Sequence, residues 1–142
     1  MRLIVARQVL GMAGWAVTLP LLKRMLSLRR LVRLLAPPAA PTPRDPAAEA
    51  QILRIVRRLY HPARHSPGTN CLERSLVLYR YLVRAGAKPH LVIGMAPPGG
   101  AFRGHAWVEV AGHPVGETRA DLAPYQPLVV FGPAGEVVPR KA

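Results

Sequence analysis

Two motifs of this sequence carry residues that together can perform acyl-transfer chemistry. Cys71, the only cysteine, stands in Asn-Cys-Leu-Glu-Arg-Ser-Leu at residues 70–76, and His105 stands in Gly-His-Ala-Trp-Val-Glu-Val at residues 104–110. A cysteine attacks a carbonyl carbon as the thiolate, and a neighbouring imidazole activates the thiol and then protonates the leaving group. The two motifs therefore predict a cysteine nucleophile with a histidine base.

The nucleophile requires a helix that begins at Cys71. Asn70 is its predicted N-cap, Glu73 occupies the capping-box position, and Gly86 stops the helix. The N-terminus of a helix stabilises a thiolate and leaves backbone N–H groups free, so the N–H of Cys71 is the predicted oxyanion-hole donor. The buried stripe of this helix is predicted to consist of Leu72, Leu76, Tyr79 and Val83.

Position along the chain selects His105 from the five histidines. His61 stands at a helix end, His65 in a loop and His90 at the start of a strand. At such positions a histidine is usually an ordinary surface or capping residue. His105 stands in a predicted strand and shares a face with Trp107, two residues on. The indole of Trp107 is therefore expected either to pack against one side of the imidazole or to lie in the core, and both interpretations stay open.

A carboxylate should orient the imidazole, and the candidates are Glu109, Glu117 and Asp121. Glu109 lies about 13 Å from His105 along the same strand, which is too far. A two-residue turn at 111–112 would point Glu117 to the face opposite His105. A three-residue loop would instead make Glu117 a diagonal neighbour of His105 on the same face. We therefore predict the three-residue loop.

The other elements follow from periodicity and from proline. Residues 1–36 contain seven basic side chains and no acid, and they predict a basic amphipathic helical arm that is broken near Pro20. Residues 37–44 predict a Pro/Ala-rich linker, and residues 45–142 a single domain. A helix is predicted from Asp45, and strands are predicted at 90–95, 103–110, 113–118 and 128–131. This order indicates an α+β fold in which the nucleophile helix packs on a small antiparallel sheet.

Composition limits the classes of function. A formal charge of +13 on 142 residues attracts polyanions, membrane surfaces or acidic protein partners. One cysteine forms no internal disulfide and favours a reducing, cytoplasmic location, and it lacks the spacing of a zinc site, so we expect neither metal nor cofactor. The apolar run 9–22 resembles a signal peptide only in outline and is too short to span a bilayer, whereas contact of the arm with a membrane surface stays open.

Several segments together resemble one known family. Residues 71–76, 91–94, 105–110 and 114–117, with Gly86 between them, are similar to the transglutaminase-like cysteine peptidase of lasso-peptide biosynthesis, the leader-peptidase part of the lasso B protein. The resemblance implies a transglutaminase/papain-like core and a triad of Cys71, His105 and Glu117. The family's third position is commonly Asp, so Asp121 stays the alternative acid.

The resemblance also implies partners. Such an enzyme removes the leader from a ribosomal precursor peptide before an ATP-dependent lasso cyclase closes the ring, and this short chain implies a stand-alone peptidase with a separate leader-binding recognition-element protein. Candidates for the substrate groove are Trp107, Arg74 and Asn70. The side chain of Arg74 has two equally open interpretations: it binds a carboxylate, or it lies in solvent. No nucleic acid is expected for this function.

Two other classes of function fit the same residues. A transglutaminase-like acyltransferase or amidase would use the same triad on another substrate, because the triad does not define the acyl acceptor. A basic adaptor for nucleic acid or a membrane surface would use the arm, and Cys71 would then be a small buried residue.

Overall fold

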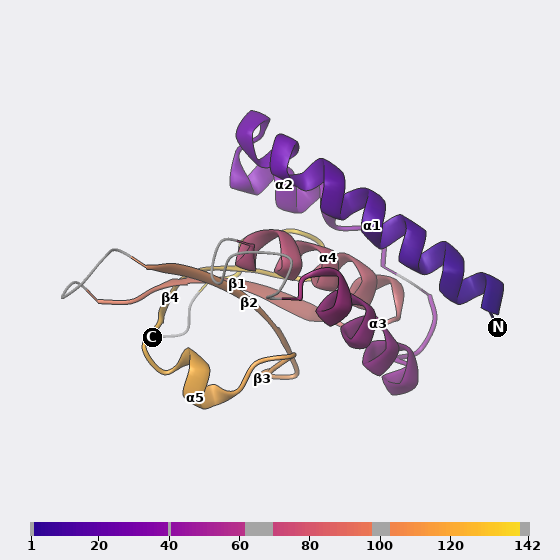
Figure 1. The fold of residues 1–142 in the computed structure, drawn as a ribbon. Helices are drawn as coiled ribbons and strands as arrows, with labels where there is room; N and C mark the ends of the chain where they lie inside the picture. The colour runs from indigo at the N-terminus through magenta and orange to yellow at the C-terminus, as the bar shows by residue number, and fades with distance from the viewer. Residues whose placement is uncertain (1, 40, 62–69, 98–102, 140–142) are drawn as a thin grey trace.

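The computed structural model describes residues 2–39, 41–61, 70–97 and 103–139 (Figure 1). His65, which was predicted to stand in a loop, lies outside these residues. The described residues form five helices and four strands. The helices are α1 (Arg2–Met25), α2 (Leu28–Leu35), α3 (Pro46–Leu59), α4 (Cys71–Arg84) and α5 (Arg119–Leu122). The strands are β1 (Pro89–Met95), β2 (Gly104–Val110), β3 (His113–Pro114) and β4 (Gln126–Phe131).

The nucleophile helix α4 lies at the centre of the fold. It packs on β1 and β2 of the antiparallel sheet, which has the order β3-β2-β1-β4, while α1, α2 and α3 cover its other sides (Figure 1). Leu76, Tyr79 and Val83 are buried as predicted, and Leu72 is half-buried. The predicted α+β class, with the nucleophile helix on a small antiparallel sheet, is confirmed.

The start of α4 is confirmed, but the predicted capping box is wrong. The helix begins at Cys71, yet the side chain of Asn70 makes no capping hydrogen bond. Glu73 is buried and its carboxylate lies 2.8 Å from the ammonium of Lys23 on α1. This ion pair draws Glu73 away from the helix terminus, because a buried carboxylate needs a charged partner more than a cap does.

The arm is helical, but its break does not fall near Pro20. Helix α1 runs through Pro20 to Met25, and the chain turns at Ser27, whose hydroxyl caps α2 by accepting a hydrogen bond from the N–H of Arg30. A proline inside a helix costs about 3 kcal/mol. Burial of the neighbouring Leu19 against the domain offsets this cost.

The arm is part of the main core. Side chains of α1 and α2 are packed in one cluster with those of α3, α4 and the sheet, and the fully buried ones of the arm are Met12, Leu19, Leu31, Val32 and Leu35. By length and composition alone, the 24-residue helix α1 is long and apolar enough to cross a membrane. The apolar run 9–22 is thus part of a longer apolar helix than predicted, although the core helix of a soluble protein meets the same test of length and composition.

The hairpin after β2 has a two-residue turn, so the predicted three-residue loop is wrong. Val110 pairs with His113 and Glu109 pairs with Pro114, which leaves Ala111 and Gly112 as the turn. Both turn residues have positive φ, 51° for Ala111 and 76° for Gly112, as the tight hairpin turn of type I′ requires. Strand β3 is only two residues long, whereas the sequence predicted a strand over 113–118.

Candidate active site

Hydrogen bonds join the first turn of helix α4 to the unpaired edge of β2, and they position the thiol of Cys71. Strand β3 pairs only with the end of β2, so the edge beside Ala106 faces the helix. The hydroxyl of Ser75, one turn beyond Cys71, donates a 2.9 Å hydrogen bond to the carbonyl of Ala106. The N–H of Ala106 in turn donates to the sulfur of Cys71. Both polar groups of this strand residue are thus satisfied by the nucleophile helix.

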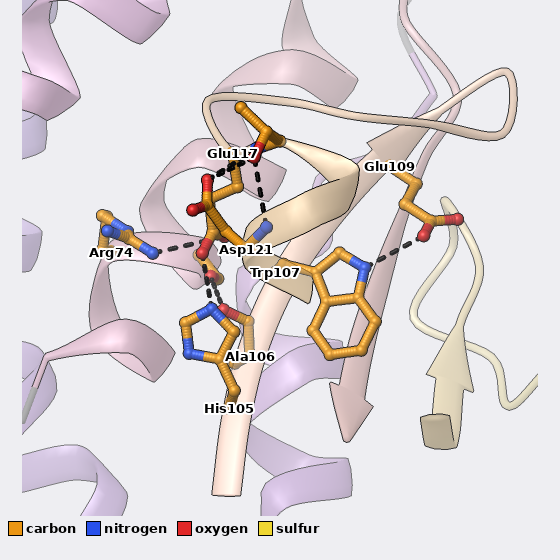
Figure 2. A network of polar contacts seen from close by, with 9 residues as sticks. Arg74, His105, Ala106, Trp107, Glu109, Glu117 and Asp121 are labelled. Carbon is orange, nitrogen blue, oxygen red and sulfur yellow. Dashed lines mark hydrogen bonds and ion pairs between the residues drawn. The ribbon is translucent and has the colours of Figure 1, made fainter. Parts of the chain in front are cut away.

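His105, the neighbour of Ala106, links Cys71 to Glu117. Its Nε2 lies 2.5 Å from Oε1 of Glu117 (Figure 2). The imidazole also forms a hydrogen bond with the thiol of Cys71. Because Glu117 engages Nε2, the nitrogen left for the sulfur is Nδ1. The residues predicted for the catalytic roles therefore form one connected chain of hydrogen bonds.

Glu117 reaches His105 by a route that the register argument did not consider. After Val115, whose N–H still bonds to the carbonyl of Val108, the chain leaves the ladder. Gly116 has a φ of 80°, which only glycine adopts readily, and it turns the backbone so that Glu117 faces the imidazole. Strand alternation no longer applies to a residue outside the ladder. The two-residue turn therefore does not point Glu117 away.

Arg74 and Asp121 occupy different positions around this carboxylate. Nη2 of Arg74 lies 3.3 Å from Oε2 of Glu117, on the oxygen that His105 does not use (Figure 2). Of the two readings left open for Arg74, this contact favours carboxylate binding, with Glu117 as the carboxylate. Asp121 forms a capping box with Thr118 at the start of α5, accepting hydrogen bonds from its backbone N–H and its hydroxyl. The alternative acid is thus engaged as a helix cap.

The electrostatics favour an ion pair between sulfur and imidazole. Burial raises the pKa of the Cys71 thiol, but the hydrogen bonds from His105 and from the N–H groups of Ala106 and Leu72, with the charge of His105, bring the net pKa below its ordinary value. The hydrogen bonds to Cys71 and Glu117 raise the pKa of His105 to about 9. Both shifts stabilise thiolate and imidazolium together at neutral pH.

Two aromatic side chains contact the imidazole. The rings of His105 and Tyr125 are stacked at 4.8 Å between centroids, and Trp107 lies at 6.0 Å. Trp107 is also buried in a small cluster with Val92 and Leu122, and its indole N–H bonds to Glu109. Trp107 therefore combines a core position with contact to the histidine. Tyr125 was not predicted, because it follows α5 in a proline-rich tail without periodicity.

Asn70 is half-buried directly before the nucleophile, and its carbonyl accepts the N–H of Arg74. The backbone N–H of Cys71 belongs to the first helical residue, which has no acceptor within the helix. Both positions suit contact with a bound acyl group. Within the described residues, no group of three or more metal-ligating side chains is present.

Comparison with known proteins agrees with this geometry. The family model described as the transglutaminase-like superfamily matches residues 15–130, which include α4, β2 and Glu117. A search of curated proteins found no significant match, and neither did a search of solved structures. Members of the matching superfamily are usually enzymes of the cysteine-protease or acyltransferase type. Because the match covers most of the chain, the protein belongs to the transglutaminase-like superfamily.

Proposed function

We propose that this protein is a cysteine peptidase that removes the leader peptide from a ribosomal lasso-peptide precursor. The observation that carries the proposal is the chain of contacts from Cys71 through His105 to Glu117, on a thiol whose pKa is lowered. The similarity of the motifs around these residues to the lasso leader peptidase gives the substrate. The superfamily alone supports only the coarser statement of cysteine-dependent acyl transfer.

The reaction follows from the positions of these groups. The thiolate of Cys71 attacks the carbonyl carbon at the junction of leader and core, and the oxyanion accepts a hydrogen bond from the N–H of Cys71. The imidazolium of His105 gives its proton to the departing amine of the core peptide, which leaves the leader as a thioester on sulfur. Neutral His105 then takes a proton from water, whose oxygen attacks the thioester. This step releases the leader carboxylate and restores the thiolate–imidazolium pair.

Glu117 has the role of orienting residue. Its carboxylate holds Nε2 of His105 in the protonated form, so that Nδ1 faces the sulfur, and it stabilises the imidazolium. Asp121, engaged with Thr118, supplies a matched control for this role.

The proposed partners follow from the same function. A separate leader-binding recognition-element protein would present the precursor, and the lasso cyclase would receive the released core. The excess of basic over acidic residues suits acidic partners.

Mass spectrometry of a precursor mixed with the protein and its leader-binding partner tests the proposal. We expect a leader fragment and a free core with the wild type and with Asp121→Asn. We expect intact precursor with Cys71→Ala, and strongly slowed release with Glu117→Gln. Cleavage by Cys71→Ala would overturn the proposal. Transfer of the leader to an added amine in place of water would favour the acyltransferase alternative.

A further inference from the structure

One face of α1 is apolar along the helix and has no cover in the described structure. Of the nine large hydrophobic side chains that are strongly exposed there, six belong to α1. One of the six, Ile4, lines a pocket together with residues of α3 and α4. The other five, between 61% and 85% exposed, are Leu3, Leu10, Val17, Leu21 and Met25. We call them the outer face of α1.

The spacing of the outer face makes it one continuous stripe. Leu3, Leu10 and Val17 are seven residues apart, and Leu21 and Met25 continue the stripe at intervals of four, which align side chains along a helix. Helix α1 is also apolar on its other side, which packs against α4. Figure 1 shows the helix lying across the molecule with its far side uncovered. An apolar stripe of this length on a soluble surface indicates an interaction site.

The charges beside the outer face are all positive. Residues 1–36 contain no acid, and all seven of their basic residues are exposed in the structure. Helical geometry places Arg7 and Arg24 at the borders of the outer face. Arg29, Arg30 and Arg33 extend the positive charge along α2. An anionic surface matches both the apolar stripe and its cationic borders.

The inner side of α1 excludes a membrane-spanning arrangement for this fold. Met12 and Leu19 are fully buried in the main core. Lys23 neutralises the buried carboxylate of Glu73, two residues from Cys71. Pulling α1 into a bilayer would expose the core and leave Glu73 without its cation. The helix can therefore meet a membrane only in the plane of its surface.

We propose that the outer face of α1 inserts into the headgroup region of an anionic bilayer, with α1 parallel to the membrane plane. A helix about 36 Å long contacts the surface over its full length, apolar residues inserted and arginines beside the lipid phosphates. A protein groove is the less favoured occupant, because the exposed residues extend evenly over the helix and do not form a compact anchor. The proposal does not depend on peptide cleavage.

Vesicle flotation of the full chain tests this inference. We expect the wild type to float with vesicles of phosphatidylglycerol and phosphatidylcholine, and not with phosphatidylcholine alone. The triple variant Leu10→Gln, Val17→Gln, Leu21→Gln retains charge and helix propensity, and its binding should fall about tenfold or more. The matched control Leu128→Gln, Val137→Gln changes exposed apolar residues that do not belong to α1 and should float like the wild type. Circular dichroism verifies that both variants are folded.

Salt and oligomeric state complete the test. At an ionic strength of about 1 M, exposed charges are screened, so residual wild-type binding that the triple variant lacks would identify apolar insertion. Absent flotation of the wild type, or equal flotation of the triple variant, would overturn the proposal. So would a triple variant that changes only a dimer, or only binding to a leader-binding protein, because the outer face would then be a protein interface.

Discussion

Arg74 and Glu117 form an ion pair, with Nη2 and Oε2 3.3 Å apart, on the oxygen of the carboxylate that His105 does not contact. Arg74 lies about one turn beyond Cys71 on α4. The helix that carries the nucleophile therefore also contacts Glu117, the residue that orients His105. A carboxylate held at both oxygens has fewer orientations than one held at a single oxygen. The ion pair thus links Glu117 to the helix that begins with Cys71.

We expect Arg74→Met to lower the rate of leader release about fivefold, since a partly exposed ion pair contributes on the order of 1 kcal/mol. Arg74→Lys keeps the charge and should retain more activity. Single-turnover rates with the precursor measure the effect. An unchanged rate for Arg74→Met would show that His105 alone suffices to place Glu117.

The pH dependence of activity should have its alkaline limit near pH 9. The pKa of His105 is raised to about 9 by its bonds to Cys71 and Glu117, so the imidazolium is lost as pH rises through that value. The interactions of His105 also contribute to the free energy of unfolding, and this contribution depends on pH in the same direction. It is complete below the ordinary histidine pKa of 6.5 and is lost as the pH rises through about 9. Profiles of kcat/KM and of thermal stability against pH measure both effects.

Glu117→Gln should move that alkaline limit to lower pH, because the amide stabilises the imidazolium less than the carboxylate does. Asp121→Asn leaves the contacts of His105 intact and should keep the wild-type limit. If both variants had the wild-type limit, Glu117 would not control the protonation of His105.

Ser75→Ala should reduce both stability and thiol reactivity. The substitution leaves the carbonyl of Ala106 without its buried partner and should lower the free energy of unfolding by about 1–3 kcal/mol. It also loosens the contact that sets Cys71 beside His105. Ser27→Ala is the matched control, because that hydroxyl caps α2 far from the site. Chemical denaturation should detect both substitutions, whereas only Ser75→Ala should slow alkylation of Cys71.

Gly116 and Gly112 allow a test of how Glu117 is placed. Both have positive φ, 80° and 76°, so alanine at either should cost about 1 kcal/mol of stability. A Cβ at Gly112 meets open space, whereas one at Gly116 would lie 2.8 Å from Cδ1 of Leu53. Gly116→Ala should therefore also displace Glu117 and lower leader release well below that of Gly112→Ala. Equal activity of the two variants would contradict this.

Much of the fold could be predicted because local signals and tertiary packing agree. Asp45 before Pro46 is a strong helix start, and both N–H groups of Ala47 and Ala48 bond to its carboxylate. The apolar run from 90 to 95 lies within β1. The helix beginning at Cys71 was also predicted, although Asn70 does not cap it with its side chain.

The errors arose where long-range contacts override local signals. Pro20 is a helix breaker in isolation, but Leu19 and Leu22 pack α1 against the domain on either side of it. Glu73 fits a capping box in sequence, yet a lysine about 50 residues away binds it. The position of Glu117 depended on where β3 ends, and a register argument assumes that the ladder continues. Arg74 and Tyr125 could not be assigned, because their partners lie on other elements.

The most direct test of the central claim is the rate at which iodoacetamide alkylates Cys71 as a function of pH. The chain has a single cysteine, so the reaction reports on this thiol alone. We expect the midpoint of the wild-type profile to lie below the ordinary thiol value, as the lowered pKa of Cys71 requires, and to move up in His105→Ala but not in His113→Ala. A wild-type midpoint equal to that of free cysteine, or one that His105→Ala leaves unchanged, would contradict a thiolate–imidazolium nucleophile at Cys71.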